Sequence, residues 1–170
     1  RLVQVGSDNV WLLGGEKIIS INFPQDSFGG GNVQPYKQSA LPKTHISFQS
    51  NIQHAIAVFY QRRVEVWVIQ ANLIDTNGRQ IIQIWHPNGT HLTSVMINET
   101  CRLTCLRQTC EEEVWVGTES GAIIRIDVES HQVIEKMKKQ HSRVVTSIQP
   151  VLCTTHDQII QMVYTGSNDQ

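Results

Sequence analysis

The sequence is poor in the features that mark membrane-spanning, exported and nucleic-acid-binding proteins. Its 170 residues include no run of about 18 apolar residues, which a membrane-spanning helix would need. The opening stretch lacks the apolar segment of a signal peptide. Only 17% of the residues are charged and the formal net charge is −1, so no strong field attracts nucleic acid. We therefore expect a cytoplasmic protein with no integral membrane segment and no nucleic-acid partner.

Cysteine is also scarce, with four residues in the chain: Cys101, Cys105, Cys110 and Cys153. This number is too small for a disulfide scaffold and fits a reducing compartment. The first three follow the spacing C-x3-C-x4-C, which lacks the paired C-x2-C knuckles of a structural zinc site. We expect no metal site, and Cys105 is predicted to fill the core.

Catalytic motifs are missing as well. The stretch "SFGGGN" (27–32) is not followed by the Lys-Ser or Lys-Thr of a phosphate-binding loop. The sequence has neither a kinase catalytic loop nor the Asp-Phe-Gly magnesium site. The seven histidines form no recurrent spacing with carboxylates. We therefore predict no catalytic residue and no cofactor in this segment.

What the sequence does contain is a succession of short β-strands. Valine, isoleucine and threonine dominate stretches of four to eight residues, which are separated by glycine, asparagine, aspartate and proline. Sustained helical periodicity is absent, and the best helical candidate, "QVIEKMKKQ" (132–140), suits an exposed outer strand equally well. An all-β chain is predicted.

The strands recur as a repeat. The stretches "NVWLLGGEKIISIN" (9–22), "HAIAVFYQRRVEVWVIQ" (54–70), "EVWVGTESGAIIRID" (113–127) and "MVYTGSND" (162–169) each begin with a strand that carries an aromatic residue. Trp115 and Tyr164 are 49 residues apart, within the range of propeller repeats. Four antiparallel strands per repeat would form a propeller blade. We predict about three and a half blades of a larger ring, in one domain: residues 1–40, 44–98, 101–139 and, incomplete, 143–170.

Glycine, proline and tryptophan add local detail. Residues 23–43 hold three of the five prolines and a triple glycine, which predicts a flexible surface insertion. Asn77-Gly78 and Asn88-Gly89 predict two-residue hairpin turns. The four tryptophans lie in predicted strands and are expected to pack blade against blade.

These features resemble the WD40-type β-propeller. Trp85-His86 stands where that family often has Trp-Asp, and Asp127 closes "IIRID" at the corresponding place in its blade. A narrower resemblance is to the divergent carboxyl-terminal propeller of the leucine-rich repeat kinases of the Roco family. In that family a "VWxG" blade follows a blade with a long third strand, as "LTCLRQTCEEEVWVGTESGAIIRID" follows "VEVWVIQANLIDTNGRQIIQIW" here.

The resemblance implies a non-catalytic scaffold for protein–protein contacts, homodimer contact or autoregulation, within a large GTPase and serine/threonine kinase. Two alternatives stay open. Propellers of DENN-type and Rho-type guanine nucleotide exchange factors carry similar "VWLG" blades, and some propellers are hydrolases with an active site in the central channel.

Two loops are the candidate contact regions. One is the basic stretch "KMKKQH" with the residue beyond it, and the other surrounds the second Asn-Gly turn. The candidate residues are His86, Asn88, His91, Lys136, Lys138, Lys139 and Arg143. The expected partners are other proteins or other domains of the same chain, including a second copy. Peripheral membrane or cytoskeletal contact stays open for the basic loop.

Overall fold

The computed structural model describes residues 2–4, 9–14, 17–22, 43–48, 50–138, 140–154 and 159–169. These residues form fourteen strands and no helix, so the predicted all-β class is confirmed. Within this described part there is accordingly no helix that could cross a membrane.

The strands form four antiparallel sheets in chain order, which we name sheets A to D. Sheet A contains β1 (Leu2–Gln4), β2 (Asn9–Gly14), β3 (Lys17–Asn22) and β4 (Lys43–Ser47). Sheet B contains β5 (Ile52–Tyr60), β6 (Arg63–Ile74), β7 (Gln80–Trp85) and β8 (His91–Ile97). Sheet C contains β9 (Leu103–Gln108), β10 (Glu113–Thr118), β11 (Ile123–Asp127) and β12 (Val133–Met137). Sheet D contains β13 (Val145–Thr154) and β14 (Ile159–Ser167).

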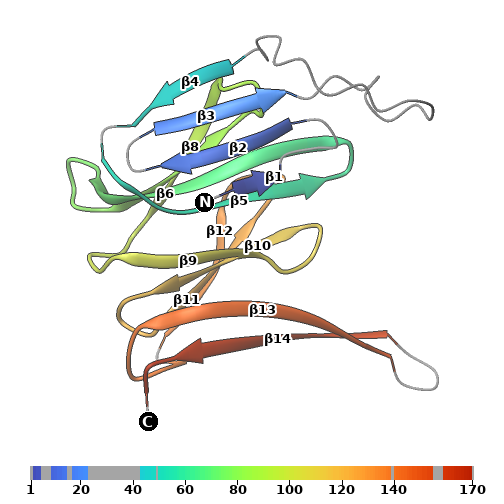
Figure 1. The fold of residues 1–170 in the computed structure, drawn as a ribbon. Helices are drawn as coiled ribbons and strands as arrows, with labels where there is room; N and C mark the ends of the chain where they lie inside the picture. The colour runs from blue at the N-terminus through green and yellow to red at the C-terminus, as the bar shows by residue number, and fades with distance from the viewer. Residues whose placement is uncertain are drawn as a thin grey trace.

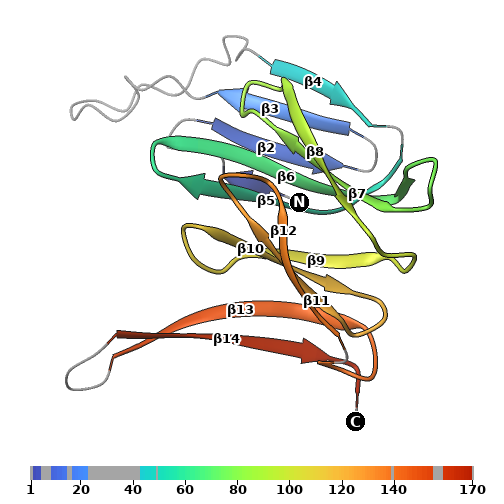
Figure 2. The ribbon, with the colours of Figure 1, turned by 180° about the vertical axis from the view of Figure 1, so that it is seen from behind.

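The sheets follow one another from sheet A at the top of Figure 1 to sheet D at the bottom, and Figure 2 shows the same order from behind. The first strands of neighbouring sheets touch: β1 contacts β5, β5 contacts β9, and β9 contacts β13. The strand order places β4, β8 and β12 at the opposite edges of their sheets. This is the arrangement of propeller blades, with first strands inside and fourth strands outside.

The core consists of the interfaces between sheets. Strand β6 shows why, because its neighbouring residues point to opposite faces. Val66 and Val68 are buried against sheet A, whereas Trp67 and Ile69 are buried against sheet C. A strand with both faces covered is apolar throughout instead of alternating. At the interface of sheets C and D, a Cβ on Gly117 would overlap Cys105 and Val145, so this glycine allows the two sheets to approach.

The two Asn-Gly dipeptides lie in hairpin loops, as predicted, but the loops have three residues. In the first loop the Asp75 N–H donates to the Arg79 carbonyl at 2.9 Å, and the Gly78 N–H donates to the Asp75 carbonyl at 3.0 Å. Gly78 and Gly89 have positive φ, whereas Asn77 does not. A two-residue turn needs positive φ at both central positions, so that part of the prediction was wrong. The observed form is a type I turn followed by a left-handed glycine.

The boundary between the first two blades also differs from the prediction. Lys43–Ser47 pairs with β3, from Lys17 opposite Ser47 to Ile21 opposite Lys43, and so completes sheet A. Sheet B therefore starts at Ile52 and not at residue 44. The sequence "HISFQS" fits a strand of either blade, because the residues of a strand do not specify its partner. Of the predicted insertion at 23–43, Lys43 begins β4 and residues 23–42 lie outside the described residues.

Candidate protein-interaction groove between sheets B and C

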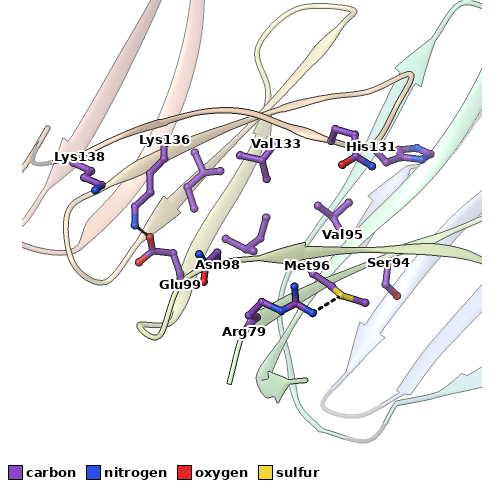
Figure 3. A pocket seen from close by; sticks show the side chains of 13 residues that line it. Arg79, Ser94, Val95, Met96, Asn98, Glu99, His131, Val133, Lys136 and Lys138 are labelled. Atoms are coloured by element: carbon purple, nitrogen blue, oxygen red, sulfur yellow. Dashed lines mark hydrogen bonds and ion pairs between the residues drawn. The ribbon is translucent and has the colours of Figure 1, made fainter. Parts of the chain in front are cut away.

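A groove of about 590 Å³ lies between β8 of sheet B and β11 and β12 of sheet C. Its floor includes Val95, Ile97 and Ile124, which are buried. Met96 and Val133 also line it, yet 51% of Met96 and 41% of Val133 are exposed to solvent. Figure 3 shows Val95 and Met96 on one of the facing strands and Val133 on the other. The groove thus combines an apolar base with accessible apolar edges.

The outer position of the two strands explains the opening. Both β8 and β12 are the last strands of their sheets. Sheets that radiate from touching inner strands diverge toward their outer edges, and strand twist increases the separation. Consistent with this, Val133 through Lys136 are all exposed, while β10 and β11 beneath them are largely buried.

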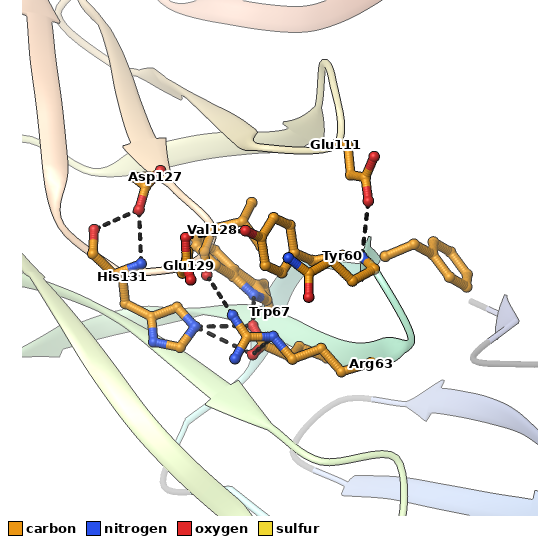
Figure 4. A network of polar contacts seen from close by, with 12 residues as sticks. Tyr60, Arg63, Trp67, Glu111, Asp127, Val128, Glu129 and His131 are labelled. Atoms are coloured by element: carbon orange, nitrogen blue, oxygen red, sulfur yellow. Dashed lines mark hydrogen bonds and ion pairs between the residues drawn. The ribbon is translucent and has the colours of Figure 1, made fainter.

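One end of the groove is closed by a polar network that crosses the interface of the two sheets (Figure 4). His131, in the turn between β11 and β12, places Nε2 at 3.0 Å from Oε2 of Glu65 on β6. The indole N–H of Trp67 donates to the same oxygen at 2.9 Å, and the Trp67 and His131 rings meet edge-on at 5.7 Å. Arg63 adds an ion pair to Glu65 at 3.6 Å and a hydrogen bond to the Val128 carbonyl at 3.3 Å.

Glu65 is charged despite its burial. It is 3% exposed, and burial alone would raise the pKa of its carboxyl group. The hydrogen bonds from His131 and Trp67 stabilise the carboxylate and, together with the charge of Arg63, hold the pKa below its usual value. The carboxylate is therefore ionised at neutral pH and joins the two sheets.

The other end of the groove is positively charged. Lys136 on β12 forms an ion pair with Glu99, which follows β8 and is buried. Arg79 lies beside Met96, with its guanidinium 3.2 Å from the Met96 sulfur, and pairs with Asp75 at 2.6 Å. Hydrogen bonds from the backbone and side chain of Arg79 hold the pKa of Asp75 below its usual value.

The groove is consequently more basic than the chain. Arg79, Lys136 and Lys138 line it, and two carboxylates offset them, because Glu99 pairs with Lys136 and Asp75 pairs with Arg79. Lys138 is left without an ion pair to a described residue and gives the groove its net positive charge. The whole chain carries a formal net charge of −1. A local excess of cations on a nearly neutral chain favours an acidic partner at this place.

Further bonds fix the two sheets relative to each other at the turn between β5 and β6. The Tyr60 hydroxyl donates to Glu129 at 3.0 Å, and the Gln61 N–H donates to Glu111 at 2.9 Å. The Gln108 side chain exchanges two hydrogen bonds with the backbone of Phe59, at 2.6 and 2.9 Å. The walls of the groove are therefore held by bonds across the interface and do not depend on apolar packing alone.

The structure separates the two predicted contact loops. Lys136 and Lys138 line the groove, Lys139 lies outside the described residues, and Arg143 is an exposed residue between β12 and β13. The loop with His86, Asn88 and His91 joins β7 to β8 and meets sheet A, because the indole N–H of Trp11 donates to the Pro87 carbonyl at 2.9 Å. His91 turns back onto its own sheet, with Nε2 at 3.1 Å from the Ser94 hydroxyl.

Sequence reasoning missed three polar residues. Glu99 lies in the groove, and Glu65 and His131 form the polar network at its end. A signal existed for Glu65, since Glu-Val-Trp occurs at both 65–67 and 113–115 at the same place in the repeat. In both copies the indole N–H donates to the glutamate at 2.9 Å. No comparable signal joins His131 to Glu65, which lies 66 residues earlier in the chain.

Within the described ranges, the cysteines and other metal-ligand types do not converge. Among the residues that the structure describes, no group of three or more histidine, cysteine, aspartate or glutamate side chains could hold a metal ion. Cys105 is buried with Ile123 and Val145, as expected for a core residue. Burial raises the pKa of its thiol, which therefore stays protonated.

The fold is that of a WD40-type β-propeller. The chain is similar to a structure of the mitotic checkpoint complex, with a TM-score of 0.54 and 15% identity over 86% of this chain and 40% of that one. It is also similar to the Pan2 WD40 domain of Neurospora crassa, with a TM-score of 0.56 and 12% identity over 98% of this chain and 48% of that one. The chain thus spans less than half the length of either structure. No protein-family model and no curated protein matches the sequence.

Proposed function

We propose that this WD40-type segment is a protein-interaction scaffold without catalytic activity of its own, and that its partner docks in the groove between β8 and β12. One observation carries the proposal: a single groove combines a buried apolar floor, the exposed apolar side chains of Met96 and Val133 at its edges, and a net positive charge. The hydrogen bond between His131 and Glu65 and the ion pair of Lys136 with Glu99 support it, because a preformed groove loses little entropy on binding.

We further propose that the segment works in the cytoplasm as part of a Roco-type GTPase and kinase, where docking would serve autoregulation or homodimer contact. The support is the resemblance of the "VWVGTESGAIIRID" blade and the blade before it to that family. Determining the full-length sequence tests this parentage. A kinase domain upstream is the expected result, and a DENN or Rho exchange domain would contradict it.

Site-specific photo-cross-linking in the full-length protein tests the scaffold role. A photoreactive amino acid would replace Met96, which is 51% exposed in the groove, or Leu152, which is 70% exposed on sheet D. We expect cells to yield a defined protein cross-linked at position 96 and to yield none of it at position 152. Equal products at both positions, or none at position 96, would refute docking in the groove.

A further inference from the structure

We infer that the groove binds an extended acidic peptide segment, in which an aliphatic side chain and a carboxylate side chain lie two residues apart, and that this segment runs along β12. The inference rests on the proposed function and specifies the chemistry of the partner. It follows from the register of β12, the free edge of that strand and the charges at its end.

The register of β12 determines the spacing between the aliphatic and the carboxylate side chain of the peptide. Val133 lies opposite Ile126, Glu135 opposite Arg125, and Lys136 opposite Ile124, so Ile134 is an extra residue in a bulge. Ile124 and Ile126 share one face of β11, and the bulge therefore places Val133 and Lys136 together on the face toward sheet B. They stand about 7 Å apart along the strand, the distance between residues i and i+2 of an extended chain.

The free edge of β12 can form hydrogen bonds with the backbone of the peptide. In sheet C the strand pairs with β11 on one side, and no described strand pairs with its other side. An exposed edge presents free N–H and C=O groups to which an extended peptide can add. Side chains of such a peptide alternate between faces, so the residues at i and i+2 would both reach into the groove.

The charges at the end of β12 select the carboxylate. The Lys136 ammonium group has three N–H donors and uses one for Glu99, so it can hold a second carboxylate. Lys138 is exposed, and no ion pair with a described residue is seen for it. The aliphatic side chain would fill the apolar part between Val133, Val95 and Met96.

The shape of the groove favours a peptide over a lipid surface. Val95, Ile97 and Ile124 form the floor of the groove and are each at most 4% exposed, whereas Met96 and Val133 protrude at its edges. A flat bilayer touches protruding residues and leaves such a floor uncovered, whereas a single strand fits between two sheets.

Fluorescence anisotropy with the full-length protein tests the inference. The probe is a labelled peptide of glycine and serine with a central Ile-Thr-Glu, and the comparison peptides carry Gln for Glu or Ser for Ile. We expect each comparison peptide to bind about tenfold more weakly, the effect of one charge-assisted hydrogen bond or one buried side chain.

Matched variants locate the peptide. We expect Lys138→Gln to weaken binding of the Glu peptide about tenfold, and Arg143→Gln, which makes the same charge change outside the groove, to leave it unchanged. Val133→Ser should weaken binding, and Ile134→Ser in the bulge should not. All four residues are exposed, so these changes do not empty the core.

Three results would overturn the inference. Equal affinity for the Glu and Gln peptides would exclude the carboxylate, and loss of binding in Ile134→Ser but not in Val133→Ser would exclude the register. Saturable binding of phosphatidylserine vesicles that Lys138→Gln abolishes, with no peptide binding, would assign the groove to a lipid headgroup. In each case the cross-link at position 96 reports separately whether a protein docks there.

Discussion

Sheets B and C carry the same Glu-Val-Trp motif on their second strands but neutralise its glutamate differently. Glu65 of sheet B is covered by sheet C and bonds to His131 of that sheet. Glu113 of sheet C is neutralised within its own sheet, where Arg125 donates two hydrogen bonds to it at 2.6 and 3.0 Å. Arg125 also bonds to Glu135 on β12 at 2.7 Å.

The difference follows from what covers each motif. The turn between β11 and β12 lies over Glu65 and Trp67, whereas only two strands of sheet D are described next to Glu113 and Trp115. A fully buried carboxylate gains from an additional partner on the covering sheet, while a partly exposed one can be satisfied by a flexible neighbour on the same surface. The Glu-Val-Trp motif is the same in both sheets, but how much it contributes to stability depends on the sheet that covers it.

The largest expected effect distinguishes the two tryptophans. Trp67 is fully buried, so Trp67→Ala should lower the free energy of unfolding by about 3 to 5 kcal/mol. Trp115 is half-buried, and Trp115→Ala should cost about 2 kcal/mol. Urea unfolding, followed by the fluorescence of the remaining tryptophans, measures both. Equal losses would show that the two motifs are covered to the same extent.

A second, smaller effect concerns the glutamates. Glu65→Leu removes the acceptor of both Trp67 and His131 in a buried place and should cost about 2 to 3 kcal/mol. Glu113→Leu leaves Arg125 paired with Glu135 and should cost about 1 kcal/mol. Combining Glu65→Leu with His131→Leu should cost less than the sum of the single changes. Strict additivity would mean that the bond across the interface contributes nothing.

The smallest effect is the dependence of stability on pH and salt. Burial opposes ionisation of Glu65, but hydrogen bonds from His131 and Trp67 lower its pKa below 4.5. Hydrogen bonds from Arg125 lower the pKa of Glu113 in the same direction. A pKa that is lowered on folding contributes stability at higher pH, and this is lost as the pH falls through the folded value.

Acid unfolding of the Gln variants at low and high salt separates the two contributions. Glu65→Gln and Glu113→Gln should each flatten the loss of stability below pH 4.5. High salt should reduce the contribution of the more exposed Glu113 and leave that of Glu65. An equal salt response would contradict the difference in burial between them.

The strands and their repeat could be predicted because they depend on local composition. Runs such as "VEVWVIQ" show burial on both faces directly in their residues, and the left-handed glycines mark the hairpins. The assignment of Lys43–Ser47 to sheet A could not be predicted, since pairing depends on which edge is free when the strand arrives. The same holds for the bulge at Ile134, which only the register reveals.

The candidate groove was predictable only in part, for the same reason. Lys136 and Lys138 stood out as a basic cluster, and the structure places both in the groove. Val95, Met96 and Glu99 come from another repeat and become neighbours of β12 only through the radial arrangement of the sheets. The loop of His86 and His91 drew attention by its polar residues, yet it contacts sheet A through Pro87.

The bond between Glu65 and His131 also imposes an order on the nascent chain. The two residues are 66 positions apart, so a ribosome would take about 3 to 13 s to add the histidine after the glutamate. During that interval the Glu65 carboxylate has only Arg63 and Trp67 of its own strand as partners, on the face that sheet C will cover. Sheet B would therefore reach its final stability only when the turn at His131 has emerged, and a translational pause between the two would prolong the time during which chaperones and proteases can act on it.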